Sequence, residues 1–194
     1  MKKISLFFGS FNPIHIGHLI LANYILEHSD ADELWFVVSP QNPFKEKKSL
    51  LKDHNRLDMV RLALQNYPKI RASNIEFLLP KPSYTIDTLT YLKEKYPDFS
   101  FSLIIGEDNL ENLHKWKNAE MLIKNHRILV YPRIFEKEKT HQEYLRHENI
   151  ILLKAPIIEL SATEIRTMIK EGKNVRPMLP PEVFEYLDGS SFYK

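Results

Sequence analysis

The chain has 194 residues, of which 43% are hydrophobic and 27% are charged, a composition typical of a folded globular protein. Its 27 basic and 25 acidic side chains give a net charge of +2, which argues against a dedicated nucleic-acid-binding protein. The sequence has no cysteine, which excludes disulfides, thiolate nucleophiles and cysteine-based zinc sites. No segment approaches the roughly 20 apolar residues of a membrane span, and the apolar run after Lys3 is too short for a signal sequence, so we expect a cytoplasmic protein without membrane contact.

The first forty residues predict a strand, a helix and a second strand. Residues 4–8 form a short apolar run typical of a buried strand, and apolar residues over 19–26 recur at mostly helical spacing. A second apolar run covers 34–38. The expected product is a parallel pair of strands joined by a right-handed helical crossover.

The turn between the first strand and its helix is the most informative stretch of the chain. It reads GSFNPIHIGH over residues 9–18 and uses two of the chain's five glycines. Backbone that approaches a ligand closely needs residues without a Cβ atom. A helix that begins near Gly17 directs N–H groups and the positive end of its dipole at the turn, which suits phosphate. His15 and His18 flank this site; both can donate to phosphate oxygens, and a protonated imidazole would also neutralise charge.

The middle of the chain predicts a helix over 53–66, with Asp53 as its N-cap. Arg56 and Arg61 are expected on the polar side of this helix, in structural roles. The irregular alternation of apolar residues over 70–79 predicts a strand.

Three further apolar runs, over 99–105, 127–131 and 149–153, predict more strands, and the charged stretch 136–147 predicts a loop or a surface helix. Together the elements predict a Rossmann-like, doubly wound α/β fold with a mainly parallel sheet and helices on both faces. We expect a single domain over 1–194, with the C-terminal helices from about residue 161 packed on it.

Two later helix starts carry polar residues that suit ligands. A helix begins in the segment 82–89, where Ser83 or Thr85 is a plausible cap. Ser161 and Glu164 have the spacing of a capping box, which predicts another helix start. On that helix Arg166 can pair with phosphate through its planar fork, while Ser161 and Thr163 face the same anion.

The turn over 9–18 resembles the signature of the nucleotidyltransferase superfamily, whose turn reads His-x-Gly-His. Class I aminoacyl-tRNA synthetases share these four residues, but the short chain has no Lys-Met-Ser-Lys-Ser-type loop. The fuller segment 9–15 is similar to adenylyltransferases that act on nicotinate mononucleotide or phosphopantetheine. The sequence departs from the nicotinate family at Phe8, where a first glycine is frequent, and has Asn12 where Asp is also common.

Two middle motifs favour the nicotinate family over the phosphopantetheine family. The segment 83–88 is similar to the family's Ser-Tyr-Thr-x-Asp-Thr, which implies that Thr85, with Tyr84, lies against the substrate base. Trp116 matches a family Trp that stacks on the pyridine ring. It follows the family's Gly-x-Asp at the expected distance. The resemblance assigns ATP binding to Gly9, Ser10, Phe11, Gly17, Gly106, Asp108, Ser161 and Thr163.

Two basic residues are compared with the family in the same way. Lys45 follows the loop after the second strand, where the family has a Lys that approaches the phosphates. The family often shows Arg-Pro-Gly where this chain has Tyr131-Pro132-Arg133, and the missing glycine argues against a phosphate role for Arg133.

The implied reaction joins ATP and nicotinate mononucleotide into nicotinate adenine dinucleotide and pyrophosphate, a step of NAD biosynthesis. The catalytic residues are then His15, His18 and Arg166, with Mg²⁺ held by phosphate oxygens and water rather than by a protein cage. Phosphopantetheine or cytidylyl transfer, a preference for nicotinamide mononucleotide, and a nucleotide-binding regulator without activity stay open as alternatives. The sequence leaves open whether the chain forms a homo-oligomer.

Overall fold

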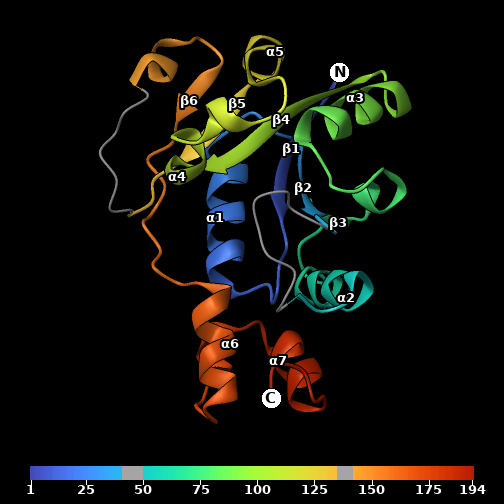
Figure 1. Ribbon diagram of the computed structural model, residues 1–194, viewed down its shortest axis with the longest axis vertical. Helices are drawn as coiled ribbons and strands as arrows, with labels where there is room; N and C mark the ends of the chain where they lie inside the picture. Colours follow the sequence, from blue (N-terminus) through green and yellow to red (C-terminus); the bar gives the residue numbers. More distant parts are fainter. Residues whose placement is uncertain (41–49, 135–141) are drawn as a thin grey trace.

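The computed structural model describes residues 1–40, 50–134 and 142–194. Its six strands form one all-parallel sheet in the order β3-β2-β1-β4-β5-β6 (Figure 1). The strands are β1 (Lys2–Gly9), β2 (Glu33–Val38), β3 (Ile70–Ser73), β4 (Phe99–Gly106), β5 (Ile128–Tyr131) and β6 (Ile150–Leu152). This order is that of a doubly wound dinucleotide-binding sheet, so the predicted Rossmann-like α/β fold is confirmed.

Helices connect the strands and cover both faces of the sheet (Figure 1). The α-helices are α1 (Ile16–Glu27), α2 (Asp53–Ala63), α3 (Thr85–Lys95), α4 (Glu107–Leu110), α5 (Ala119–Asn125), α6 (Ala162–Lys170) and α7 (Pro181–Asp188). The 3₁₀ helices are η1 (Ile75–Leu78), η2 (Leu113–Lys115), η3 (Gln142–Arg146) and η4 (Arg176–Met178). No helix of the described ranges is long and apolar enough to cross a membrane.

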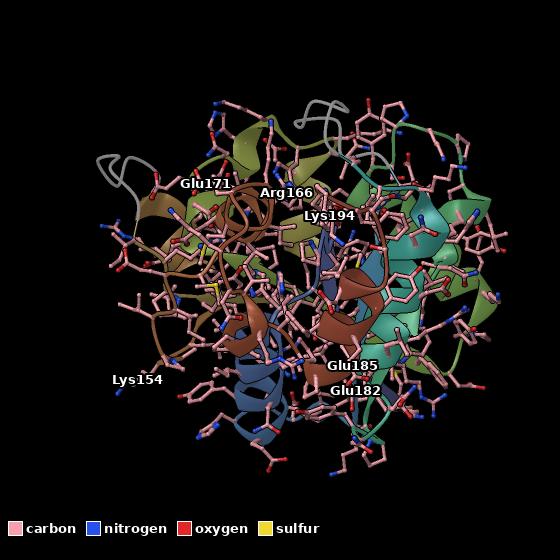
Figure 2. All side chains as sticks on the ribbon, turned by 90° about the horizontal axis from the view of Figure 1, so that it is seen from below. Lys154, Arg166, Glu171, Glu182, Glu185 and Lys194 are labelled. Atoms are coloured by element: carbon pink, nitrogen blue, oxygen red, sulfur yellow. The ribbon has the colours of Figure 1, made fainter. Side chains whose placement is uncertain are left out.

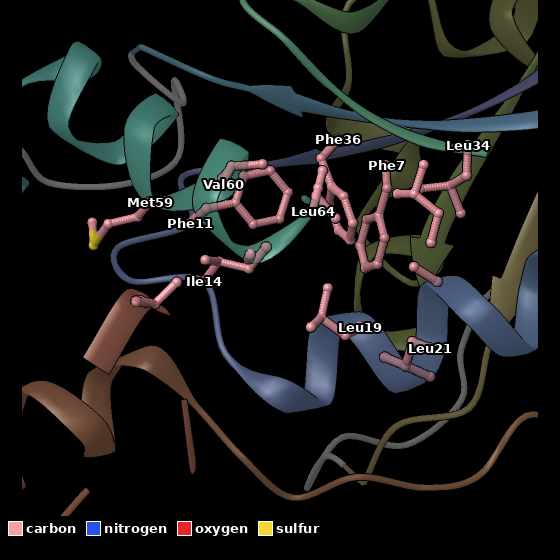
Figure 3. Close-up of a cluster of buried hydrophobic side chains, with 14 of the residues drawn as sticks. Phe7, Phe11, Ile14, Leu19, Leu21, Leu34, Phe36, Met59, Val60 and Leu64 are labelled. Atoms are coloured by element: carbon pink, nitrogen blue, oxygen red, sulfur yellow. The ribbon is translucent and has the colours of Figure 1, made fainter. Parts of the chain in front are cut away.

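Successive residues of the central strands feed two separate hydrophobic clusters, one on each face of the sheet. In β1, Leu6 enters the cluster beneath α3 and α5, whereas Phe7 enters the cluster that contains α1, α2, α6 and α7. In β2, Trp35 and Phe36 divide in the same way. This alternation follows from the two-residue period of a strand that is buried on both faces. Figure 3 shows Phe7 and Phe36 beside α1, in the cluster that contains α1, α2, α6 and α7.

The strand order reverses between β1 and β4, the point at which open α/β sheets bind ligands. Phe7 of β1 pairs with Ile104 of β4, so Gly9 and Gly106 end their strands at the same edge of the sheet. The turn over 9–18 and the start of α4 therefore lie at the same edge of the sheet, where an open α/β sheet is expected to form its ligand crevice.

Several local predictions are wrong. The segment 70–79 does not form one strand: β3 ends at Ser73 and the 3₁₀ helix η1 follows, because Asn74 accepts a backbone bond from Phe77 at 2.9 Å. Asp53 is not the cap of α2 but its first residue, and its carboxylate binds Arg56 and Lys81 instead.

The caps of the two later helices also differ from expectation. The N-cap of α3 is Tyr84, without a side-chain cap bond, so neither Ser83 nor Thr85 caps it. Ser161 does cap α6, since its hydroxyl accepts the backbone N–H of Glu164 at 3.1 Å. This hydrogen bond is one of the two that the predicted capping box of Ser161 and Glu164 requires.

Candidate active site

The segment 9–18, called the signature turn below, is packed around Phe11. This buried residue has a φ of 45°, and its ring meets Phe36 and His18 edge-on at centroid distances of 5.1 and 5.2 Å. A Cβ atom at Gly9 would lie 2.7 Å from the Phe11 ring. The turn therefore needs glycine at position 9 to admit its own phenyl ring, a reason that sequence analysis did not foresee.

His15 and His18 cap the start of α1 reciprocally. The backbone N–H of His15 donates to Nδ1 of His18 at 3.2 Å, and the backbone N–H of His18 donates to the carbonyl of His15 at 3.0 Å. Their ring centroids lie 3.7 Å apart. Because Nδ1 of His18 accepts a hydrogen bond, the neutral His18 ring carries its proton on Nε2.

Burial sets the charge of His15. Its side chain is 5% exposed, and burial, with the nearby positive charge of Arg133, lowers the pKa of His15 to about 4. His15 is therefore neutral at pH 7 and can act as a hydrogen-bond donor. The charge neutralisation that a protonated imidazole would offer is therefore not available from His15 near neutral pH.

Arg166 connects α6 to the signature turn. Its Nη1 donates to the backbone carbonyl of Asn12 at 2.8 Å, and its Nη2 donates to the hydroxyl of Thr163 at 3.2 Å. The structure thus brings together the two motifs that lie farthest apart in the sequence. These bonds use two of the five N–H groups of a guanidinium, so the fork retains further donors for an anion.

Arg56 is a part of the site that sequence analysis missed. The side chain is completely buried rather than on the polar side of α2. It donates to the backbone carbonyls of Ser10, Ser39 and Leu51, and it pairs with Asp53 at 2.8 Å. Arg56 therefore ties the signature turn to the end of β2. Its spacing from Asp53 is that of an ordinary surface ion pair, so the sequence carries no signal for burial.

The end of β4 lies next to the end of β1, where the signature turn begins. A Cβ atom at Gly106 would collide with the Asp108 carboxylate and would lie 2.7 Å from Cδ of Arg133. Glycine at this position thus lets Asp108 and Arg133 converge. The sequence argued against a phosphate role for Arg133. In the structure this residue lies beside Gly106, a predicted ATP-binding residue, and its positive charge lowers the pKa of His15.

The residues expected at the substrate base lie on two neighbouring segments. Tyr84 is the N-cap of α3 and Thr85 its first residue, and Trp116 is the C-cap of η2. Lys117 joins the segments: its ammonium binds the Asp87 carboxylate at 2.8 and 2.9 Å and lies 5.0 Å from the centre of the Tyr84 ring. Tyr84 and Trp116 are half-buried against the same hydrophobic cluster.

A buried carboxylate supports α3 from behind. Thr88 on α3 donates to Oε1 of Glu76 at 2.8 Å. Burial raises the pKa of Glu76, and the nearby hydroxyl groups of Ser39, Thr88 and Ser83 oppose that rise. The end of β2 and the start of α3 thus meet at one acidic side chain, which the sequence did not single out.

Two expectations concern features outside this geometry. Lys45 lies outside the described residues. Across 1–40, 50–134 and 142–194, no group of three or more His, Asp or Glu residues could hold a metal ion.

Comparison with known proteins places the chain in a family. The cytidylyltransferase-like family model matches residues 6–168. A probable nicotinate-nucleotide adenylyltransferase of Flavobacterium johnsoniae is 56% identical over 192 residues, 99% of each chain. The chain belongs to this family. Another probable member, from Bacteroides thetaiotaomicron, is 47% identical over 95% of this chain and 90% of its own length.

Solved structures agree on the fold of this family. The nicotinic acid mononucleotide adenylyltransferase of Plasmodium falciparum, solved in complex with NaAD, aligns with a TM-score of 0.80. The alignment covers 100% of this chain and 98% of that chain at 21% identity. The same protein in complex with APC aligns with a TM-score of 0.79.

Proposed function

We propose that the protein transfers the adenylyl group of ATP to nicotinate mononucleotide, releasing pyrophosphate and forming nicotinate adenine dinucleotide. One observation carries this proposal: the paired histidines of the signature turn and the guanidinium of Arg166 are fixed to one another through Asn12. That arrangement gathers phosphate donors from both ends of the sequence at one sheet edge. The names of relatives up to 56% identical over the full chain support the same activity.

The reaction needs no protein nucleophile, because a phosphate oxygen of the mononucleotide attacks the α-phosphorus of ATP and pyrophosphate leaves. Catalysis is then positioning and stabilisation of charge. In our proposal Nε2–H of His18 donates to the α-phosphoryl oxygen on which charge develops. Neutral His15 donates beside it, and Arg166 with Ser161 and Thr163 holds the β- and γ-phosphates.

The rest of the signature turn and the end of β4 frame the nucleotide in this proposal. Gly9, Ser10, Phe11 and Gly17 shape the phosphate turn, and Gly106 with Asp108 lies across the crevice. Lys45 is assigned to the transferring group on the family pattern alone. Arg133 joins the assigned residues, because its side chain lies beside Gly106 and its positive charge acts on His15.

Mg²⁺ enters the proposal as the counter-ion of ATP. The described residues hold no acidic or histidine cluster of three. In this proposal phosphate oxygens and water supply its ligands, as is usual for Mg²⁺ on nucleotides. When bound, the ion neutralises the charge of the triphosphate.

Substrate choice is assigned to the segments that Lys117 joins. Thr85, at the N-terminus of α3, offers backbone N–H groups to a carboxylate of the pyridine. Trp116 offers an indole face to the cationic ring, and Tyr84 lines the same side. These groups favour the nicotinate substrate over phosphopantetheine, which has no aromatic ring to stack.

The proposal is tested by pyrophosphate release with Mg-ATP and, in parallel, nicotinate mononucleotide, nicotinamide mononucleotide and phosphopantetheine. We expect strong preference for the nicotinate form. Release with phosphopantetheine alone would keep the phosphate residues and discard the base assignments. Binding of ATP without release from any acceptor would instead identify a regulator.

A further inference from the structure

Asn12 is the junction of the signature turn, and the C-terminal tail is bound to it. The hydroxyl of Tyr193 donates to Oδ1 of Asn12 at 2.6 Å, and the backbone N–H of Leu51 donates to the same oxygen at 3.2 Å. The backbone carbonyl of Asn12 accepts Arg166 at 2.8 Å. One buried residue thus joins the signature turn to α6, to the start of α2 and to the chain after α7.

The tail is folded to deliver Tyr193 to this place. Ser190 donates to the carbonyl of Leu187 at 2.8 Å and accepts the backbone N–H of Phe192 at 3.1 Å, which turns the chain back after α7. Tyr193 itself has a φ of 64°, in the left-handed region that is unfavourable for a bulky side chain. A strained backbone is retained where surrounding contacts determine it, and such residues cluster at functional sites.

The surroundings of Tyr193 keep its hydroxyl a donor. Burial raises the pKa of Tyr193 above its usual range, against the lowering effect of Arg166 and Arg56. Figure 2, seen from below, shows Arg166 on α6 and Lys194 at the end of the tail on the same part of the molecule. The Tyr193 hydroxyl therefore stays protonated and donates its hydrogen bond to Asn12, near Arg166 and Arg56.

We propose that Tyr193 is a positioning residue for the ATP site, acting through Asn12 on the signature turn and on Arg166. The inference rests on the proposed function, because that function gives Arg166 its phosphate. Tyr193 holds the side chain of Asn12, and Arg166 binds the carbonyl of the same residue. A shift of Asn12 therefore moves the guanidinium, and it moves His15 three residues further on.

The test is Tyr193→Phe, which keeps the ring and removes the hydroxyl. Loss of this partly buried hydrogen bond frees the turn, and misplacement of phosphate donors is costly for the reaction. We expect kcat/KM for ATP to fall about tenfold. The matched control is Tyr186→Phe on α7, whose ring packs on Phe192 in the same region. This control should stay within about twofold of the wild type.

A double-mutant cycle distinguishes positioning from general destabilisation. If part of the effect of Tyr193 passes through Asn12 to Arg166, its substitution should lower kcat/KM by a smaller factor in an Arg166→Ala background than in the wild type. Equal kcat/KM for Tyr193→Phe and the wild type, or fully additive effects of the two substitutions, would overturn the proposal.

Two further measurements keep the test independent of folding and of the proposed function. The ATP-induced rise in melting temperature, taken against each variant's own ligand-free melt, should be smaller for Tyr193→Phe than for Tyr186→Phe. An unchanged rise would contradict the role of Tyr193. This readout needs no acceptor, so it tests Tyr193 even if the wild type releases no pyrophosphate, the result that would reject the proposed function.

Discussion

The phosphate side and the base side that we propose for the candidate site are held together in different ways. The phosphate side, formed by the signature turn and α6, is joined by partly buried hydrogen bonds from Arg56, Arg166 and Tyr193 to backbone or amide oxygens. The base side, formed by 84–88 and 116–117, is joined by the ion pair between Lys117 and Asp87. The Lys117 side chain is 44% exposed and the Asp87 side chain is 47% exposed. Buried polar networks are costly to disturb, whereas exposed ion pairs contribute little.

This difference fits a division of labour. In our proposal ATP is the constant substrate, so a rigid phosphate side would serve any acceptor. A base side made of half-buried rings and one exposed ion pair can change at small cost in stability. The four predictions below test whether the phosphate side is the more sensitive of the two.

The largest effect is expected at His18. His18→Ala removes the donor assigned to the α-phosphoryl oxygen, and we expect turnover to fall by a factor of roughly a hundred or more, the scale of one lost stabilising donor. Steady-state pyrophosphate release measures the effect. His54→Ala, an exposed histidine on α2, is the control and should retain full turnover. Near-normal turnover of His18→Ala would remove His18 from the catalytic assignment.

His15 should make the phosphate side sensitive to acid. Its pKa is lowered to about 4 in the folded protein from 6.5, so between these values the unfolded chain binds a proton that the native protein excludes. The free energy of unfolding therefore falls as the pH drops from 6.5 toward 4, by about 2 kcal/mol at pH 5.

Urea unfolding at pH 7.5 and at pH 5 measures this loss. The His15→Asn variant lacks the titrating ring and should lose about 2 kcal/mol less than the wild type over the same interval. An identical loss in both proteins would mean that His15 titrates normally in the native state.

The sequence predicts the strands of the sheet better than it predicts the side chains that support the site. Apolar runs such as 34–38 and 99–105 predict strands well, because a parallel sheet buried on both faces leaves a continuous hydrophobic signal. Glycines before helices correctly mark the ends of β1 and β4. Their reasons are partly different, since Gly9 admits the Phe11 ring and Gly106 admits Asp108 and Arg133.

The supporting residues escape prediction because their partners are distant in sequence. Arg56 has the local spacing of a surface ion pair, yet it is buried by carbonyls of two other segments. Tyr193 lies in an unremarkable tail, and its partner Asn12 is 181 residues away. Burial of this kind is decided by tertiary contacts and leaves no periodic pattern in the chain.

A smaller effect is expected from Trp116 on the base side. Trp116→Ala removes the ring face assigned to the pyridine, and stacking on an aromatic side chain contributes about 1–3 kcal/mol per base. We expect KM for nicotinate mononucleotide to rise about tenfold while KM for ATP stays nearly constant. Trp116→Phe keeps an aromatic face and should recover part of the loss. Equal increases in both KM values would place Trp116 in general packing rather than at the base.

The smallest effect is expected from Lys117, the group that joins the base side. An exposed pair of this kind contributes about 0.2–1 kcal/mol, so Lys117→Ala should raise KM for the mononucleotide less than about fivefold. The rise should also shrink with added salt, because salt screens the wild-type pair. Kinetics at low and high ionic strength measure both effects, with Lys81→Ala, another exposed partner of an aspartate, as control. A loss as large as that of Trp116→Ala would show that the base side depends on one rigid contact. The contrast between a fixed phosphate side and an adaptable base side would then fail.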